Sequence, residues 1–317
     1  MESSELYNIK QQFTLGAYKT LVQLALPDES STDYLPSLLY KTRAYIALKE
    51  PQSALDLIPE SAENVAVKAV ASLARYISAV DSTETESALE ELRDLSVEIE
   101  GDDVEGSEKD KALVKVLAGT AFVRAGEIEE ALETLGSETE DLEAVAIIVQ
   151  IYLSINRPDL AKKQFERSKR WAEDDLLLQL IESTIGLVTG KDNYANTSSF
   201  YTEQLGNPSL TSPHLLTARG VTRILRGEIA EAKSDLEESF AQQKGDAEAE
   251  AAYVVASSLD ASKKSEAAGA GPDELWLTLV SEHPSHPLVQ DVTQKADMFD
   301  QYAAVYVVPP QANTVSA

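Results

Sequence analysis

The chain has 317 residues, 27 basic and 54 acidic, so its formal charge is −27. A surface this negative repels phosphate backbones and anionic lipid headgroups, which argues against direct binding to nucleic acid and against direct membrane insertion. The absence of cysteine excludes disulfides and thiolate metal sites, and an aromatic fraction of only 6% with abundant Ala, Leu and Glu favours an all-α fold.

The amino-terminal segment does not resemble a targeting sequence. Met1 to Lys10 contains two Glu and lacks a basic region followed by an apolar core, so we expect no signal peptide. The longest nearly charge-free apolar stretch, Ala144 to Ile155, is far shorter than the ~20 residues that a membrane-spanning helix needs. Together with the lack of cysteine, which suits a reducing compartment, these features predict a cytoplasmic protein.

A helix–turn–helix pattern recurs along the chain. In its clearest copies a turn glycine is followed five positions later by a small residue, as in Gly126 with Ala131 and Gly227 with Ala232. Adjacent copies are 30 to 37 residues apart, close to the ~34-residue period of tetratricopeptide repeats, and the longer gap between positions 49 and 126 fits two repeats plus an insertion. The weaker copies pair Gly16 with Leu21, Lys49 with Ala54, Asn156 with Ala161 and Gly190 with Ala195.

Other positions of each repeat fit the packing of a helical hairpin. A small residue seven positions before the turn lets the two helices approach closely, and an aromatic ring four positions before the turn packs beside it. Ile9 and Val149 replace the small residue in two copies, and Gly186 and Arg223 replace the ring in two others, so an irregular helical domain remains the alternative. The residues that fit are Gly119 and Gly220 (small), Tyr45, Phe122 and Tyr152 (aromatic), and Leu135, Phe165 and Leu236 (large apolar, in the second helix).

Two segments are expected to interrupt the array. Asp81 to Asp110 carries 13 acidic residues against two basic ones, and its part at about 100–108 has almost no apolar spacing, which predicts a solvated acidic loop there. A stretch rich in Lys, Ala and Gly at about 262–272 is expected to link two helices.

The chain is expected to close with two helices. Asp273 to Ser281 and Pro287 to Val307 have helical patterns, and two consecutive prolines follow the second. A terminal helix of this kind caps a solenoid whose last hairpin would otherwise expose an apolar face. We therefore predict a single domain over 1–317, a tetratricopeptide-like right-handed α-solenoid of helical hairpins with a carboxy-terminal capping helix and a disordered tail at about 309–317.

No motif for catalysis or cofactor binding accompanies the repeats. The sequence has no phosphate-binding loop, no H-E-x-x-H or G-x-S-x-G motif and no dinucleotide fingerprint. His283 and His286 have a spacing that suits two metal ligands on one helical face, but Pro284 and Pro287 favour a rigid turn instead. Close acidic pairs arise by chance in a chain with 54 acidic residues, and none lies in an apolar setting that would tune a catalytic acid. We expect no enzyme activity, no cofactor and no metal.

The first helix of each hairpin lines the concave face of such a solenoid, and its inner positions here are mostly apolar. A partner that covers an open apolar groove gains about 25 cal/mol per Å² of apolar surface, which predicts partner binding at this face. The alternative is a solenoid wound so tightly that these residues pack on one another as core. The candidate partner-binding residues are Leu39, Arg43, Ile46, Val116, Val123, Gln150, Leu153, Leu180, Leu187, Val221 and Ile224.

The order of several short motifs resembles the epsilon subunit family of the coatomer vesicle coat. The resemblance covers about residues 5 to 307, and the acidic loop and the Ala-Gly-rich stretch depart from it. The motifs that carry it are Glu5–Lys10 with Phe13-x-x-Gly16-Ala17-Tyr18, the R-A-Y-I-A segment Arg43–Ala47, Val149–Leu153 with Asn156–Ala161, and Ser285–Leu288 with Lys295-Ala296-x-x-Phe299-Asp300.

This resemblance implies a function that composition and spacing do not show. Members of the family are non-catalytic COPI coat subunits that curl around a projection of the C-terminal domain of alpha-COP, and so join the other coatomer subunits. The chain is then expected to support Golgi-to-ER retrograde and intra-Golgi transport, peripheral on Golgi membranes and COPI vesicles. Two alternatives stay open: a tetratricopeptide adaptor for another partner such as a chaperone tail, and an acid-pair hydrolase built on a helical toroid. Adaptors that bind charged tails line the groove with Lys, Arg and Asn, and Arg43 alone is of that type here.

Overall fold

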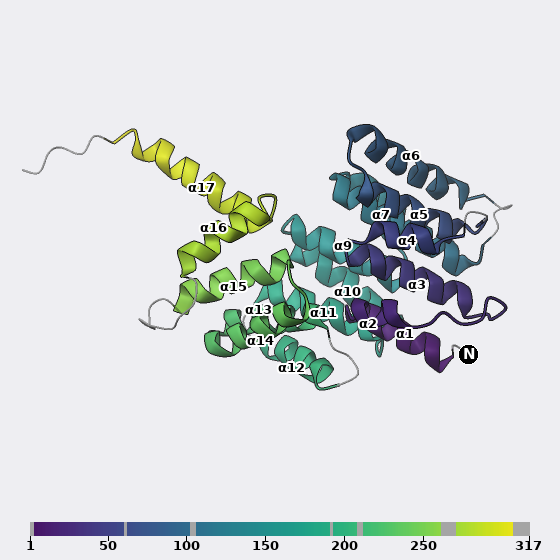
Figure 1. The fold of residues 1–317 in the computed structure, drawn as a ribbon, viewed down its shortest axis with the longest axis horizontal. Helices are drawn as coiled ribbons and strands as arrows, with labels where there is room; N and C mark the ends of the chain where they lie inside the picture. The colour runs from purple at the N-terminus through teal and green to yellow at the C-terminus, as the bar shows by residue number, and fades with distance from the viewer. Residues whose placement is uncertain are drawn as a thin grey trace, which may run out of the picture.

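The computed structural model describes residues 3–59, 62–101, 106–190, 193–207, 212–260 and 271–306, and within these ranges its regular structure is entirely α-helical (Figure 1). The predicted all-α class is therefore confirmed. Among the described helices, none is both long and apolar enough to cross a membrane. The helices are α1 (Ser4–Thr14), α2 (Tyr18–Gln23), α3 (Tyr34–Ala47), α4 (Pro51–Leu57), α5 (Val65–Ser78), α6 (Ser82–Glu98), α7 (Glu108–Ala125), α8 (Ile128–Leu135), α9 (Leu142–Ser154), α10 (Pro158–Ala172), α11 (Leu176–Thr189), α12 (Asn193–Leu205), α13 (Pro213–Arg226), α14 (Ile229–Gln242), α15 (Ala247–Asp260), α16 (Pro272–Glu282) and α17 (Pro287–Ala303).

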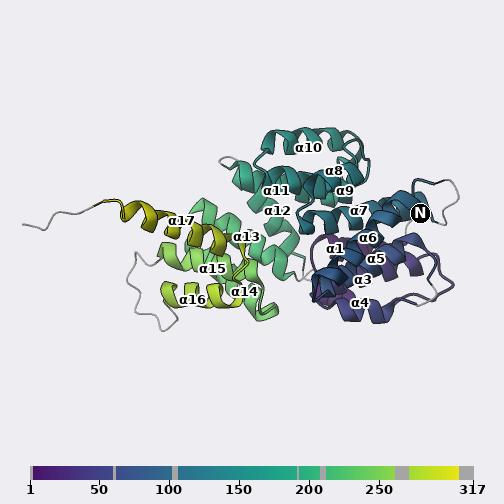
Figure 2. The ribbon, with the colours of Figure 1, turned by 90° about the horizontal axis from the view of Figure 1, so that it is seen from above.

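The helices form a curved array of hairpins. Each odd-numbered helix from α3 to α13 packs against the even-numbered helix that follows it, and α1, α3, α5, α7, α9 and α11 stack on one another in that order. Further along, α13 packs on α12 and α14, and α15 packs on α13 and α14 (Figure 2). Because contacts are made mainly between neighbouring hairpins, the chain has the architecture of a helical solenoid.

The six turn positions expected from the sequence all have a positive φ angle. Glycine reaches this left-handed region without steric cost, whereas Lys49 (φ 62°) and Asn156 (φ 56°) reach it in spite of their Cβ atoms. Such a residue ends the first helix and turns the chain into the second. The four glycines are Gly16, Gly126, Gly190 and Gly227.

The predicted small residues allow close helix packing. A Cβ atom added to Gly119 would lie 2.7 Å from Leu135 Cγ, and one added to Gly220 would lie 2.9 Å from Leu236 Cγ. The glycine of one helix therefore receives the large apolar side chain of the next, as the repeat pattern predicts. Five of the six residues that follow the turns are at most 1% exposed: Leu21, Ala54, Ala131, Ala161 and Ala232.

The hairpin of α11 and α12 departs from the repeat. Ala195, the sixth of these residues, is exposed, unlike the other five. Gly190 has a ψ of −169° and α12 begins only at Asn193, which shifts the second helix along the first. Thr197 then packs on Gly186, where an added Cβ would lie 2.5 Å from Thr197 Oγ1. This close approach leaves no space for the ring that the pattern places at position 186.

The acidic segment is mostly a repeat, not an interruption. Residues 82–98 form α6, which packs on α5 and α7, with Leu92 wholly buried. Arg93 of α6 makes ion pairs with Glu86, Glu90, Glu127 and Glu130, and so neutralises part of the surrounding negative charge. The expected loop at about 100–108 matches the connection between α6, which ends at residue 98, and α7, which begins at residue 108, and its positions 102–105 lie outside the described residues.

The amino-terminal hairpin returns to the middle of the chain and closes the array. Leu15, in the turn between α1 and α2, is 0% exposed and packs in a cluster with Phe200, Tyr201 and Leu215. Lys10 Nζ lies 3.8 Å from Asp175 Oδ2, at the start of α11. Figure 1 shows α1 beside α11. The chain is therefore wound tightly enough for its first hairpin to contact the hairpins of α11 to α14.

The two closing helices are confirmed at the expected place. Leu279 and Val289 are buried where α16 and the first turn of α17 cover α15, which caps the end of the array. Beyond that turn α17 extends away from the other helices (Figure 1), and Phe299 and Tyr302 are exposed. The predicted linker at about 262–272 falls outside the described residues except for 271 and 272, and the predicted tail at about 309–317 lies outside them entirely.

Candidate functional site

A groove of about 310 Å³ lies on the inner side of the array. It is lined by the first helices of successive hairpins, α3, α5, α7, α9 and α11, together with the amino-terminal hairpin. Its apolar surface comes from residues such as Leu73, Ile77 and Ile147, and its exposed polar groups include Arg124 and Gln150. This is the inner groove, and it corresponds to the concave face that the sequence predicts as the binding surface.

A bidentate ion pair crosses the inner groove. Both terminal nitrogens of Arg43 on α3 donate to the carboxylate of Glu143 in the first turn of α9. The guanidinium also lies 4.4 Å from the centroid of the Phe13 ring on α1, a cation–π contact. Three helices that are distant in sequence therefore meet at one mostly buried cation.

The surroundings of this pair shift the pKa values of its neighbours. Burial alone would lower the pKa of Arg43, but the charge and hydrogen bonds of Glu143 outweigh it and raise the pKa. Burial raises the pKa of Tyr18, and the positive charge of Arg43 offsets only part of that change. Arg43 therefore stays charged and committed to Glu143, which makes it a structural element of the groove.

Four of the predicted partner-binding residues line the inner groove: Arg43, Ile46, Val116 and Gln150. Gln150 is exposed, whereas Ile46 and Val116 are at most 8% exposed and belong to the main core, as does Leu39. Only part of the predicted surface is thus open to a partner.

The other predicted residues are distributed over separate clusters. Leu180 and Leu187 pack against the cluster of Leu15, Phe200, Tyr201 and Leu215, to which the chain's own first hairpin contributes Leu15. Both leucines are half-buried, and neither lines the inner groove. The remaining residues are Val123 beside the main core, Leu153 beside the cluster of α9 to α11, and Val221 and Ile224 beside Leu236.

Sequence reasoning missed Phe13, Tyr18 and Glu143 as parts of the groove. Glu143 lies 100 residues from Arg43, and both aromatic residues come from the first hairpin. A periodic pattern reports the face of a single helix and carries no signal for the partner on a distant one. Phe13 and Tyr18 do belong to a motif that the sequence singled out, but nothing local indicates their contact with Arg43.

The histidine turn near the carboxy terminus has a structural role. His286 Nδ1 accepts a hydrogen bond from the Leu288 amide and so caps α17. His283 Nε2 lies 3.2 Å from a carboxylate oxygen of Glu250 on α15. Glu250, Glu282 and His283 place one ligand-type atom each within 4.8 Å of one another. The turn between α16 and α17 agrees with the rigid turn predicted there.

Comparison with known proteins gives a consistent result. Residues 2–307 match the family described as "Coatomer epsilon subunit". The coatomer subunit epsilon-1 of Arabidopsis thaliana is 29% identical over 93% of this chain and 95% of the plant protein. The coatomer subunit epsilon of Caenorhabditis elegans is 24% identical over 95% of this chain and 98% of its own, and a probable coatomer subunit epsilon of Schizosaccharomyces pombe is 25% identical over 76% of each.

Solved structures support the fold alone. A tetratricopeptide repeat protein from Parabacteroides merdae superposes with a TM-score of 0.51 at 14% identity, over 88% of this chain and 98% of that one. A chain of the APC/C hetero-tetramer Cut9–Hcn1 gives a TM-score of 0.57 at 13% identity, over 91% of this chain and 54% of that chain. The predicted tetratricopeptide-like solenoid is therefore confirmed.

Proposed function

The chain belongs to the coatomer epsilon subunit family, and from that premise we propose that its inner groove clasps the C-terminal domain of alpha-COP. The family makes it a subunit of the COPI coat that associates with other coatomer subunits. In the proposed function it is a non-catalytic structural subunit that holds the alpha subunit in place during Golgi-to-ER retrograde and intra-Golgi transport.

The observation that carries this proposal is the continuity of the inner groove across seven helices. Ile77, Ile147 and Leu177 line the groove and are half-buried, so part of each side chain can contact a projection of a partner that enters the groove. Covering such apolar surface stabilises the complex by about 25 cal/mol per Å². The exposed amide of Gln150 and the exposed guanidinium of Arg124 then supply hydrogen bonds that fix the orientation of the partner.

The electrostatics also favour a function inside a protein assembly. A formal charge of −27 repels the anionic lipids of a membrane surface, so the chain is expected to reach Golgi membranes and vesicles through its partners. Arg43 is already paired with Glu143, so it is not available to hold the carboxylate of an acidic chaperone tail. Glu143, the single carboxylate among the residues that line the inner groove, is paired with Arg43, so this groove does not offer the acid pair of a hydrolase.

A steric block of the inner groove tests the proposal. Gln150→Trp places a large ring in the groove from an exposed position, so it leaves the fold intact. The matched control is Gln52→Trp, at an exposed position of α4 that does not line the groove. Calorimetric titration with the purified C-terminal domain of alpha-COP should show at least tenfold weaker binding for the first variant and unchanged binding for the second. If the two variants bind the alpha-COP domain with equal affinity, the inner groove is not the binding surface.

A further inference from the structure

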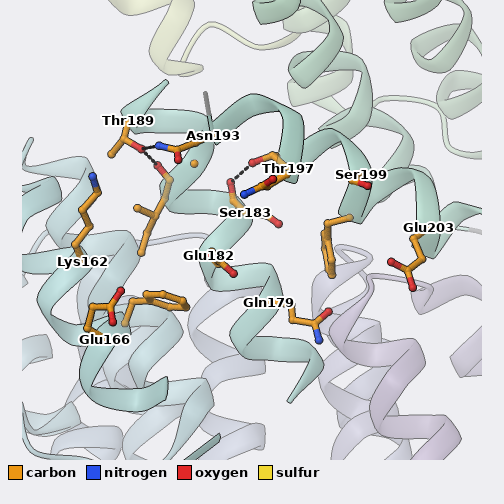
Figure 3. A pocket seen from close by; sticks show the side chains of 15 residues that line it. Lys162, Glu166, Gln179, Glu182, Ser183, Thr189, Asn193, Thr197, Ser199 and Glu203 are labelled. Atoms are coloured by element: carbon orange, nitrogen blue, oxygen red, sulfur yellow. Dashed lines mark hydrogen bonds between the residues drawn. The ribbon is translucent and has the colours of Figure 1, made fainter. Parts of the chain in front are cut away.

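A second groove, here called the outer groove, lies between α10 and α12 with α11 as its floor (Figure 3). Its volume is about 620 Å³, and it shares no lining residue with the inner groove. It is walled by the second helices of two successive hairpins, whereas the inner groove is lined by first helices. The chain therefore has a binding-sized cavity that the clasp of alpha-COP does not use.

Three glutamates from three different helices surround the outer groove. Glu166 on α10 and Glu203 on α12 lie on opposite sides, with Glu182 of α11 between them (Figure 3). All three are exposed, and none forms an ion pair with any residue of the described ranges. Lys162 is the single cationic side chain among the lining residues, so the groove keeps a net negative charge.

The base of the groove is apolar. Phe165 and Phe200 are 7% and 9% exposed, so each keeps only a small part of its ring accessible, and Ile185 lies between the two walls at 5% exposed. Ser183, also 5% exposed, lines the groove, and its hydroxyl has no hydrogen-bond partner in the described part of the chain. A ligand is thus offered aromatic surface, a free hydroxyl and carboxylates within one cavity.

We propose that the outer groove binds an exposed segment of a partner protein that carries arginine beside an aliphatic residue. A guanidinium satisfies two carboxylates at once through its fork of N–H donors, and it also stacks well on an aromatic face. The neighbouring aliphatic side chain covers the accessible edges of Phe165 and Phe200. The ligand is a cationic peptide segment because the unpaired charge of the groove is negative and its base is apolar.

The proposal goes beyond the clasp of alpha-COP and does not depend on it. Since the two grooves share no residue, one chain can hold alpha-COP on its inner side and an arginine-bearing segment on its outer side. Failure of either binding assay leaves the other interpretable.

The probe for the test is a fluorescein-labelled hexapeptide, Gly-Arg-Leu-Arg-Leu-Gly, titrated against the full chain by fluorescence anisotropy at 0.15 M salt. Its counterpart with citrulline in place of arginine has the same shape without the charge. The arginine peptide should bind at least tenfold more tightly than the citrulline peptide. Equal binding of the two peptides would refute recognition of a cation.

Matched variants separate the groove from the general negative charge of the chain. Glu166→Gln/Glu182→Gln/Glu203→Gln removes three charges from the groove and should weaken binding at least tenfold. The control removes three exposed charges from residues that do not line the groove, and it should change binding less than twofold. Equal loss in both triple variants would show non-specific attraction and overturn the proposal. The control variant is Glu129→Gln/Glu133→Gln/Glu140→Gln.

A gain of affinity completes the test, because misfolding cannot mimic it. Lys162 is exposed and lines the groove, so Lys162→Glu adds negative charge without affecting the core. Binding of the arginine peptide should tighten about threefold in this variant, and binding of the citrulline peptide should stay unchanged. An unchanged affinity for the arginine peptide would place its binding site elsewhere.

Discussion

The ion pair across the inner groove offers the sharpest test of how the array is held together. Arg43 and Glu143 have side chains that are 11% and 26% exposed, and they join α3 to α9. Arg43→Met keeps the aliphatic stem that packs in the groove and removes the charge. The variant leaves the Glu143 carboxylate mostly buried and without its cationic partner. An unpaired buried charge costs more free energy than the ion pair contributes to stability.

The size of the effect follows from the burial of both groups. Breaking a fully buried pair from one side costs about 3–5 kcal/mol, and the residual exposure of Glu143 reduces this to roughly 2–4 kcal/mol. Loss of the cation–π contact with Phe13 adds about 0.5–1 kcal/mol. We therefore expect Arg43→Met to destabilise the chain by about 3 kcal/mol. With a urea slope on the order of 3 kcal/mol per M, the unfolding midpoint falls by about 1 M.

Urea unfolding followed by circular dichroism measures this shift. Arg75→Met is the control, because Arg75 pairs with Glu91 at the surface, where both side chains are nearly half exposed and the pair contributes less than about 1 kcal/mol. The double variant Arg43→Met/Glu143→Leu removes the buried charge as well and should recover most of the lost stability. Equal midpoints for Arg43→Met and Arg75→Met, or no recovery in the double variant, would refute the reasoning.

Three further predictions concern other parts of the array. Leu15→Ala should cost about 2–5 kcal/mol and increase hydrogen exchange in α11 to α13, whereas Val80→Ala at a 95% exposed position should change neither by a measurable amount. Gly119→Ala should lower stability by about 1–2 kcal/mol although alanine has the better helix propensity, because the added Cβ would lie 2.7 Å from Leu135 Cγ. In the double variant Gly119→Ala/Leu135→Ala this clash is absent, so the further loss should be smaller than the full cost of truncating a buried leucine. Burial raises the pKa of Asp141, the cap of α9, above the ordinary aspartate value of 3.8, so the folded state disfavours the charged form of this side chain. The free energy of unfolding therefore falls as the pH rises above about 3.8, where Asp141 ionises in the unfolded chain. Asp141→Asn keeps the capping oxygen, so it should be at least as stable as the original chain at pH 7 in urea unfolding, and the advantage should shrink as the pH falls toward 4.

The hairpins could be predicted because their chemistry is local. A left-handed residue at Gly126 or Asn156 ends one helix, and the small residue five positions later starts the packing of the next. The same reasoning failed at Ala195, where the offset of α12 depends on the contact of Gly186 with Thr197, a contact between two helices. It also treated residues 82–98 as an interruption, because a high acidic content hid the helical spacing of Leu92 and its neighbours.

The candidate site was predicted only in part. The spacing of inner positions selected Arg43 and Gln150, which line the inner groove, and their contact with a partner stays a prediction. It gave no means of separating Leu180 and Leu187, which pack against the cluster that contains Leu15, from positions that remain open. The outer groove was not predicted at all, since Glu166, Glu182 and Glu203 are separate charges on three helices until the fold brings them around one cavity.

The sequence by itself determined the all-α class, the repeat and the places where the chain turns, because these depend on residues within a few positions of one another. It also carried the motifs of the coatomer epsilon subunit family over about residues 5 to 307. Only the tertiary structure decided that the first hairpin closes the array at Leu15 and that Arg43 meets Glu143 across 100 residues. The physical reason is that such contacts depend on the curvature accumulated over successive hairpins, and no local pattern encodes that sum.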